Sequence, residues 1–508
     1  MTAIPSESES LPLFRQVMLL VSLSVSTLIY GMALTMANVL LPQIQGSLSA
    51  TQDQIAWVVT FHLVAVAVAT PLSGWVAGLI GRKRFLTGTI VCFVISTVLC
   101  GASDSLTELV VWRIAQGLFG APLMPLVQAI ILDVYPRRNH ALVTMLWGLV
   151  AVSGPFTGAI FGGYVGELID WRWAFYLVTP IGILAWTGCQ IFLTEGWRGR
   201  TEHMDWTGFL SLIIAIGTFQ LMLDRGLRLD WFESTEIIIE AVVAALAFYI
   251  FLVHSLTAQR PFLNLRILRN RNFSLGLIFA FIFGALYLTP MVLYPTLLQD
   301  LRDFPESVIG VLLSARAVGN WFSFLVVVQL THFSTRLTIT MGFLCQLLGG
   351  LWMASLDMNL TLWDVIWTNA IQGFGTGIIY VPMTIIAFSA LSSRDFAEGS
   401  AMFHLLRNMG SAIFISVSVT LVVTSGNASY AGLTEFASTF SELLRNPGLV
   451  GAWSIENPGG LLGLSGEMQR QAAMIGYINA FHLFNILACA VIPLVLLVQT
   501  GGETGVRR

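Results

Sequence analysis

The chain has 508 residues, of which 56% are hydrophobic and only 10% are charged, and its formal net charge is −3. Soluble domains carry about 25% charged residues, so this composition excludes an ordinary soluble protein. The small net charge gives no reason to expect a nucleic-acid partner. The five cysteines lack the spacing of metal ligands, and we predict no metal site.

Fourteen apolar runs follow one another along the chain, each long enough to cross a hydrocarbon core of about 30 Å as a helix. None alternates with the period of two residues that a membrane β-barrel requires. The sequence therefore predicts an all-α polytopic membrane protein with 14 transmembrane helices. The predicted limits are 17–42, 55–80, 85–103, 107–132, 140–167, 174–194, 206–224, 236–256, 273–296, 308–330, 338–357, 362–391, 400–425 and 477–498.

The basic residues predict the orientation, because Lys and Arg concentrate in cytoplasmic loops. Of the 25 basic residues, 16 fall on the side of the N-terminus, 6 fall in the opposite loops and 3 lie within spans. We therefore expect residues 1–16 and the tail 499–508 to be cytoplasmic. The segment before Arg15 carries no cleavable signal pattern.

The fifth predicted span has one smooth face, because its glycines recur every four residues. An interior Gly costs about 1 kcal/mol and a Pro about 3 kcal/mol in a soluble helix, whereas membrane helices use such faces for close packing. We expect this face to close the interface between two helix bundles. It contains Gly154, Pro155, Gly158, Gly162 and Gly163.

An offset of 256 residues relates the two parts of the chain, since it matches Gln116 with Gln372 and Gly154 with Gly410. The offset predicts that spans 1–6 are repeated as spans 9–14. The predicted divisions are an N-terminal six-helix bundle at 17–200, an inserted hairpin at 201–260 and a C-terminal bundle at 261–498. Pro155 and Gly158 match Ser411 and Phe414, so the smooth face is expected in the first half only.

Residues 426–473 contain Gly, Pro, Asn and several charges, and we predict a periplasmic loop there. The loop is either a solvated connector or a contact surface for a partner outside the membrane.

Arginines inside predicted spans are the strongest candidates for function, because a charge at the bilayer centre costs about 3 kcal/mol on insertion scales. Arg113 shares a helix face with Gln116, Gly117 and Gly120. It either ties helices together or tunes a proton-binding or substrate-binding group.

Two further spans carry polar residues at helical spacing. In the thirteenth span these are His404, Arg407, Asn408 and Ser411, and in the tenth they include Arg316 and Asn320. The stripes either line a pathway or consist of arginines that reach back to the membrane surface. The candidates for a substrate cavity are Gln116, Gln128, Arg316, Asn320, Gln372, His404, Arg407, Asn408 and Ser411.

A proton-driven transporter needs groups that bind and release protons, and the candidates are Arg113, Asp224 and His404. Histidine is considered because it titrates near neutral pH. Asp224 ends the seventh span, where the alternative is an interfacial carboxylate paired with Arg225 or Arg228. Asp133, at a helix end before Tyr135 and Pro136, is expected to organise a cytoplasmic gate.

These motifs resemble the drug:proton antiporter branch of the major facilitator superfamily. The stretch 154–163 resembles its fifth-span antiporter motif, 113–117 its fourth-span motif and 171–182 its sixth-span signature. The resemblance implies two six-helix bundles, export of hydrophobic or amphiphilic small molecules, and a proton gradient as the energy source in place of a cofactor. The segment 221–239 is similar to exporters that work with a periplasmic adaptor and an outer-membrane channel. The loop motif at 74–84 implies a cytoplasmic gate containing Gly74, Arg82, Lys83, Arg84 and Asp133.

Two positions depart from the family pattern. Ala33 stands where the first-span motif has an Asp, and Gly78 stands where the loop motif has one. With Ala33 neutral and three arginines in the spans, we expect a positive cavity that favours anionic or weakly acidic amphiphiles. The alternatives are an exporter of one metabolite, such as a siderophore or lipid-like acid, and a scaffold or sensor that transports nothing. No nucleophile with a base appears in the spans, so we do not expect an enzyme.

Overall fold

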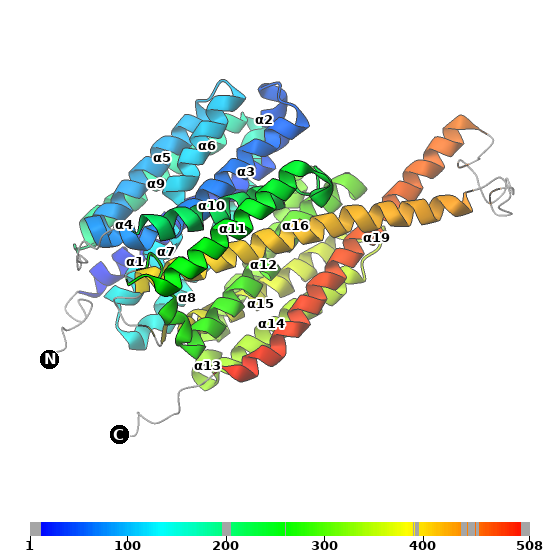
Figure 1. Ribbon diagram of the computed structural model, residues 1–508. Helices are drawn as coiled ribbons and strands as arrows, with labels where there is room; N and C mark the ends of the chain where they lie inside the picture. Colours follow the sequence, from blue (N-terminus) through cyan, green and yellow to red (C-terminus); the bar gives the residue numbers. More distant parts are fainter. Residues whose placement is uncertain are drawn as a thin grey trace.

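The computed structural model describes residues 12–195, 205–259, 261–389, 396–437 and 457–498, together with residues 391, 444 and 453. These residues form helices and no strand, and most of the helices run in a similar direction (Figure 1). The helices are α1 (Leu13–Val39), α2 (Leu41–Ser47), α3 (Gln52–Ala69), α4 (Leu72–Ile80), α5 (Arg82–Gly101), α6 (Leu106–Gly120), α7 (Leu123–Val134), η2 (Arg137–Asn139), α8 (His140–Leu168), α9 (Trp171–Phe192), α10 (Trp206–Arg225), η3 (Trp231–Glu233), α11 (Thr235–Thr257), η4 (Leu265–Arg269), α12 (Arg271–Arg302), α13 (Glu306–Phe333), α14 (Thr335–Ala354), α15 (Leu362–Ser389), α16 (Phe396–Phe436), α19 (Pro458–Val491) and η6 (Ile492–Leu497).

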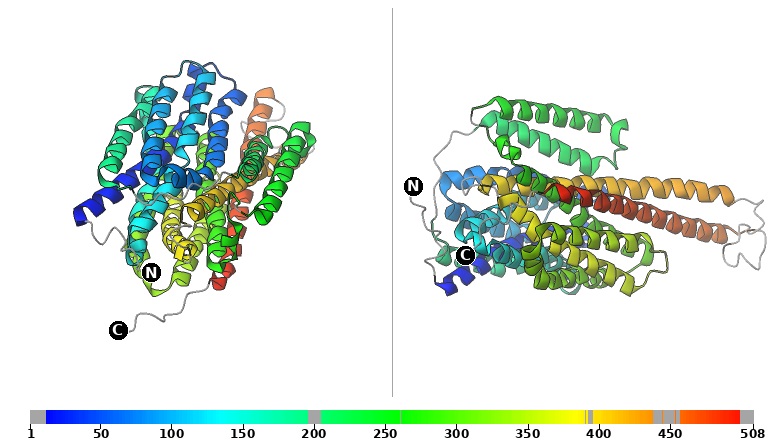
Figure 2. Two further views of the ribbon diagram at one scale, coloured as in Figure 1. Left: turned by 60° about the vertical axis from the view of Figure 1, so that its left-hand side comes forward. Right: turned by 90° about the horizontal axis from the view of Figure 1, so that it is seen from below.

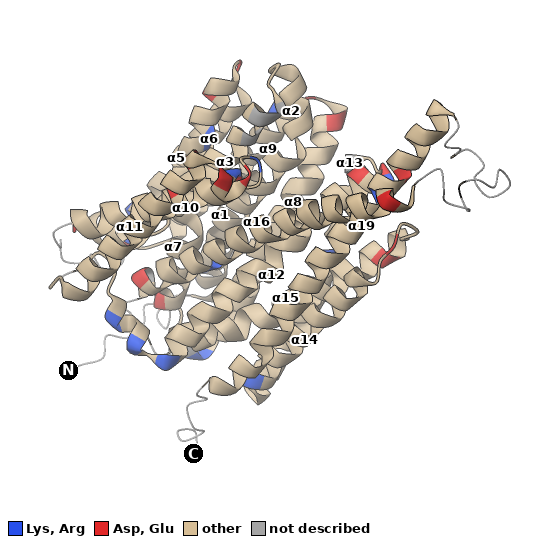
Figure 3. Cartoon of the chain, turned by 45° about the vertical axis from the view of Figure 1, so that its right-hand side comes forward, with Lys and Arg blue, Asp and Glu red and all other residues tan. Residues whose placement is uncertain are grey.

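Thirteen described helices are long and apolar enough to cross a membrane, and there are fourteen if the bent pair α3 and α4 forms one span. The two parts of that pair meet at 55°. Pro71 precedes α4 and lacks the N–H group that would continue a straight helix. The predicted all-helical membrane fold is therefore confirmed. Figure 3 shows a row of Lys and Arg at the end of the molecule nearest both termini.

The predicted repeat is visible in the helix contacts. In the first half α1 packs against α8, α3 against α6, and α5 against α9. In the second half the corresponding pairs are α12 with α16, α13 with α15, and α14 with α19. The same three pairings thus occur in both six-helix bundles.

The inserted helices α10 and α11 lie beside the two bundles as a separate pair (Figure 2). Helix α10 contacts α3 of the first bundle and also α16 of the second. The Ser416 hydroxyl of α16 donates a hydrogen bond of 2.8 Å to the Leu223 carbonyl of α10. The inserted pair therefore touches both bundles.

The predicted loop at 426–473 is wrong at both ends, because α16 continues to Phe436 and α19 begins at Pro458. The Tyr430 and Ser465 hydroxyls lie 3.0 Å apart, and Gly426 packs on Ala472. Small residues that suggest a loop thus let two helices approach. At about 1.5 Å per residue, the 41 residues of α16 are about 60 Å long, and the pair projects beyond the other helices (Figure 1).

Residues 438–443, 445–452 and 454–456 of this predicted loop lie outside the described residues. So do the first eleven residues of the predicted N-terminal segment and the whole predicted tail 499–508.

Candidate functional site

The glycine face of α8 packs against α1, within the first bundle. A Cβ added to Gly158 would lie 2.7 Å from the Met32 Cα, and one added to Gly154 would lie 3.0 Å from the Leu28 carbonyl oxygen. Gly162 meets Met36 in the same way, and Gly163 is in ordinary contact with Val39. The prediction that this face closes the interface between bundles is therefore wrong. A small-residue pattern shows where a helix can approach, but it does not show which helix does.

Pro155 belongs to the same contact. The Thr35 hydroxyl of α1 donates a hydrogen bond of 2.6 Å to the Pro155 carbonyl. Pro155 has no N–H group of its own and disturbs the ladder of its helix, so this bond from a neighbouring helix helps to hold α8 in place.

The second bundle has a matching contact between α12 and α16. A Cβ on Gly410 would lie 3.0 Å from the Phe281 Cα, and one on Gly284 would lie 2.9 Å from the Ser411 hydroxyl. The expectation of a smooth face in the first half only is thus wrong. The spacing of glycines along α16 does not show the second contact, because one of its glycines, Gly284, lies on α12. Gly284 holds the position there that Gly31 of α1 holds in the first bundle.

Arg113 is fully buried in the first bundle. Its guanidinium donates to the Gln116 side chain at 2.5 Å and to the backbone carbonyls of Ala33 and Val58, both at 3.2 Å. Gln116 in turn donates to the Thr97 hydroxyl at 2.7 Å. Ala33, which stands where the family motif has an Asp, thus contacts Arg113 through its backbone oxygen.

The second bundle also buries an arginine, Arg316, which is 1% exposed. It donates to the Gln372 side chain at 3.0 Å and to the Leu286 carbonyl at 3.4 Å. Its guanidinium also lies 5.5 Å from the centre of the Tyr287 ring, a favourable cation–π position. Asn320 is fully buried on the same helix, and neither of its amide atoms has a hydrogen-bond partner among the described residues.

The two arginines reach their glutamines from different helices. Arg113 and Gln116 share α6, whereas Arg316 lies on α13 and Gln372 on α15. In the first bundle His62 of α3 packs against Gly117, and in the second Arg316 packs against Gly373. The second arginine therefore occupies the place of His62. Among the described ion pairs none contains Arg113 or Arg316.

The two bundles meet at a polar contact that we call the Gln128 latch, made by Pro125 and Gln128 of α7 with Ser400 and His404 of α16. Ser400 donates to the Pro125 carbonyl at 2.9 Å and to the Gln128 side chain at 3.1 Å. The His404 Nε2 lies 2.6 Å from the same Gln128 oxygen. Because that oxygen accepts, Nε2 carries the hydrogen, and His404 Nδ1 has no partner among the described residues.

Arg407 lies one turn from the latch and points between the bundles. One guanidinium nitrogen contacts the Met124 sulfur of α7 at 3.6 Å, and another donates to Asn408 at 3.3 Å. Ser411 donates to the Arg407 carbonyl at 3.0 Å. The stripe on this helix thus lies at the bundle interface, which favours the pathway interpretation over an arginine reaching for the membrane surface.

Aromatic residues form a further part of the interface between the two bundles. Tyr380 of α15 lies 6.1 Å from the Trp147 ring of α8, and its buried hydroxyl has no hydrogen-bond partner within the described part of the chain. Nearby, Trp321 of α13 donates to the Ser153 hydroxyl of α8 at 2.9 Å. Tyr380 was not a candidate in the sequence, because an aromatic residue in an apolar span gives no signal.

Asp224 does not lie at the central interface. It accepts a hydrogen bond from Thr60 of α3, so it joins the inserted pair to the first bundle. Arg225, one of its predicted partners, instead forms ion pairs with Glu236 and Glu240 of α11.

The predicted gate residues form contacts within the first bundle. Arg82 and Asp133 form an ion pair of 2.5 Å, and Arg84 and Glu195 form one of 2.6 Å. Lys83 donates to the Gln190 carbonyl at 2.7 Å. Gly74 lies on α4, and α4 contacts α16 of the other bundle. Ion pairs thus connect the predicted gate residues within the first bundle. Helix α4 also contacts the second bundle.

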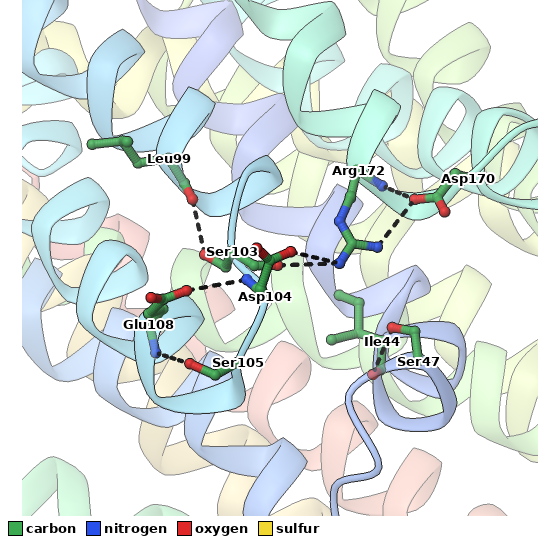
Figure 4. A network of polar contacts seen from close by, with 9 residues as sticks. All are labelled: Ile44, Ser47, Leu99, Ser103, Asp104, Ser105, Glu108, Asp170 and Arg172. Atoms are coloured by element: carbon green, nitrogen blue, oxygen red, sulfur yellow. Dashed lines mark hydrogen bonds and ion pairs between the residues drawn. The ribbon is translucent and has the colours of Figure 1, made fainter.

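Figure 4 shows the network at the opposite end of the first bundle. Arg172 donates to the Ser103 carbonyl at 3.2 Å and forms ion pairs with Asp104 at 3.6 Å and with Asp170 at 3.9 Å. It also lies 4.5 Å from the Trp171 ring centre. Arg172, the second residue of the sixth-span signature, therefore links α9 to the turn after α5.

Comparison with known proteins matches residues 23–415 to the family described as Major Facilitator Superfamily. The chain is 32% identical over 431 residues to the multidrug export protein EmrB of Escherichia coli K12, covering 84% of both chains. It is 31% identical to the fatty acid resistance protein FarB of Neisseria gonorrhoeae, covering 93% of this chain and 94% of FarB. A solved bacterial homolog of the lysosomal transporter Spinster covers 97% of this chain with a TM-score of 0.55 at 15% identity, which supports the fold.

Proposed function

Since the chain belongs to the Major Facilitator Superfamily as a multi-pass multidrug efflux transporter, we propose that it exports amphiphilic compounds from a bacterial inner membrane in exchange for protons. In this proposal both termini are cytoplasmic and the proton gradient is the only energy source, without a cofactor. The two bundles rock about the contact between α8 and α13.

One observation carries the proposed substrate class. Each bundle buries an arginine that is held by carbonyl and amide oxygens, and neither arginine has a carboxylate partner among the described residues. A third arginine, Arg407, lies between the bundles. Buried charge without a counter-ion is costly, so an anionic or weakly acidic substrate would gain more from this interior than a cation. One relative is named for resistance to fatty acids, which supports the same class.

His404 is the proposed proton carrier of the Gln128 latch. A proton added to its free Nδ1 would create a second positive charge beside Arg407 in a buried contact. Like charges in a poorly solvated place repel strongly, so protonation would favour separation of α7 and α16. Arg113 would act indirectly, through the Ala33 and Val58 carbonyls that fix α1 and α3 around it.

Asp224 is the alternative proton-binding group. Its contact with Thr60 joins the inserted pair to α3, and the neighbouring Leu223 carbonyl binds Ser416 of the other bundle. A change in its charge would act on a helix that touches both bundles.

We also propose a periplasmic adaptor protein and, through it, an outer-membrane channel as partners. The projecting part of α16 and α19 supports this, because it reaches well beyond the span of a membrane. Purification of the full chain from its own membranes tests the partner: a stoichiometric adaptor is expected, and its absence under several mild detergents would favour a solitary carrier.

The transport proposal is tested with the purified protein in liposomes that carry a pH gradient. We expect laurate or an acidic uncoupler to cause more proton flux than in matched liposomes without the protein, and a cationic dye of similar size to cause little additional flux. Strong flux with cationic dyes and none with acids would overturn the substrate class. Flux with one acid alone would identify an exporter of a single metabolite, and a complete lack of solute-dependent flux would favour a scaffold or sensor.

A further inference from the structure

A pocket of about 340 Å³ lies between the two bundles at the end that carries the termini. Its volume is within the usual range of small-molecule sites, which begins at about 300 Å³. Helices α7 and α8 line it from the first bundle, and α13, α14, α15 and α16 line it from the second. It is separate from the arginines inside the bundles and from the Gln128 latch, none of whose residues line it.

The lining of the pocket favours negative charge. Arg138 of η2 lies on one side and His332 of α13 on the other. Three helices begin at its wall, since His140 starts α8, Thr335 starts α14 and Phe396 starts α16. Helix N-termini carry a partial positive charge and free N–H groups. Among the described residues that line the pocket there is no Asp or Glu.

One buried side chain gives independent support for a ligand. Thr144 of α8 lines the pocket and is only 2% exposed. Its hydroxyl forms no hydrogen bond with any other residue that the structure describes, whereas the neighbouring Thr384 hydroxyl donates to the Val381 carbonyl at 2.8 Å. Because Thr144 lines the pocket, its hydroxyl can donate a hydrogen bond to an acceptor bound there.

The rest of the wall is apolar. Leu132, Ile385, Phe388 and Phe396 form this part of the lining. A small inorganic anion would leave this surface uncovered, whereas a chain attached to an anionic group would cover it.

We propose that this pocket binds the anionic head group of an amphiphile, a carboxylate or a phosphate, with the first part of its chain on the apolar wall. Arg138, Thr144 and the starts of α8 and α14 would hold the head group. The inference rests on the proposed export function, because it gives acidic substrates a place to collect before the bundles open. Since both bundles contribute to the wall, separation of the bundles at this end would release the head group.

The experiment measures equilibrium binding of radiolabelled laurate to the full-length protein in nanodiscs of phosphatidylcholine. Arg138→Gln is expected to weaken laurate binding by about tenfold or more, because a charge-assisted hydrogen bond is lost. The control variant is Arg269→Gln, an exposed arginine of η4 near the same end that does not line the pocket, and its binding should match the native protein. Dodecyltrimethylammonium, which has a similar chain and a positive head, should bind weakly to all three proteins.

A second variant, Thr144→Val, preserves the shape of the wall and removes only the hydroxyl, and it is expected to weaken laurate binding severalfold. Adding phosphatidylglycerol to the nanodiscs distinguishes the sources: competition with laurate in the native protein indicates a lipid phosphate, and its absence indicates a free carboxylate. Equal laurate binding by Arg138→Gln and Arg269→Gln, with no effect of Thr144→Val, would overturn the proposal. The assay needs no proton gradient, so a failure of transport with binding intact would overturn only the proposed export function.

Discussion

Gln116 and Gln372 occupy matching positions in the two halves, and each accepts a hydrogen bond from a buried arginine that comes from a different helix in each half. In the first bundle the arginine lies one turn away on the same helix, so it ties α6 to α1 and α3 through their carbonyls. In the second bundle it crosses from α13 to α15. The two halves thus share a buried glutamine, but the arginine that binds it connects different helices in each half.

Arg113→Gln should fold and insert, since it removes a buried charge whose desolvation is costly. Transport coupled to the proton gradient should fall by at least about tenfold, because the Ala33 and Val58 carbonyls lose their donor. Arg269→Gln serves as the control, since Arg269 is exposed on η4 and lies outside the predicted gate. Uptake by liposomes with an imposed pH gradient measures the effect, and normal coupling in Arg113→Gln would contradict the proposed role.

Substituting the glycines at the two close helix contacts should destabilise both bundles. A Cβ at Gly158 would lie 2.7 Å from the Met32 Cα, and one at Gly284 would lie 2.8 Å from the Arg407 carbonyl carbon. Because backbone atoms cannot move aside, each Gly→Ala change should cost about 1–3 kcal/mol. Gly432→Ala, with nothing within 4 Å of the added Cβ, should be neutral or stabilising. Thermal unfolding in detergent compares them, and an unaffected Gly284→Ala would show that the second contact is not tight.

Gln128→Ala should weaken the latch between α7 and α16, because the Ser400 and His404 donors lose their shared acceptor. We expect a larger population with the bundles apart at this end. Spin labels at Asn139 and His332, one in each bundle, would report longer distances by pulsed electron paramagnetic resonance. Gln128→Glu retains the acceptor and should keep the native distance, and identical distributions in all three proteins would show that the latch does not hold the bundles together.

Asp205 should make stability depend on acid pH. Burial by itself opposes its charge, but the Gly208 and Phe262 backbone N–H groups and His254 hydrogen-bond its carboxylate and hold its pKa below the usual value. A lowered folded-state pKa gives stability that is complete above the unfolded pKa of about 4. That stability is lost as the pH falls through the lowered value. Asp205→Asn should therefore melt at a lower temperature at neutral pH and lose part of the acid dependence, and parallel curves for the two proteins would exclude this contribution.

The sequence predicted the spans and the repeat well, because both depend on composition and spacing along one helix. Arg113 and Gln116 were found together for the same reason, since residues three apart share a face. The contact of Arg316 with Gln372 and the contact of Gly284 with α16 join different helices. Spacing within a segment does not specify such neighbours. His62 was overlooked, although a histidine inside a predicted span is a polar signal that could have been used.

The projecting helices were missed for a different reason. Beyond the hydrocarbon core a helix needs no apolar run, so its composition resembles that of a loop. The contact of Tyr430 with Ser465, across 35 positions of the sequence, stabilises the pair there.

The continuity of α16 makes it a lever arm. The helix carries His404 of the latch near one end and ends at Phe436 in the projecting part. At about 1.5 Å per residue these points are about 50 Å apart, so a tilt of about 5° at the latch would move the far end by about 4 Å. A change of one proton or one hydrogen bond at the latch would thus displace the projecting end of α16 on the far side of the membrane.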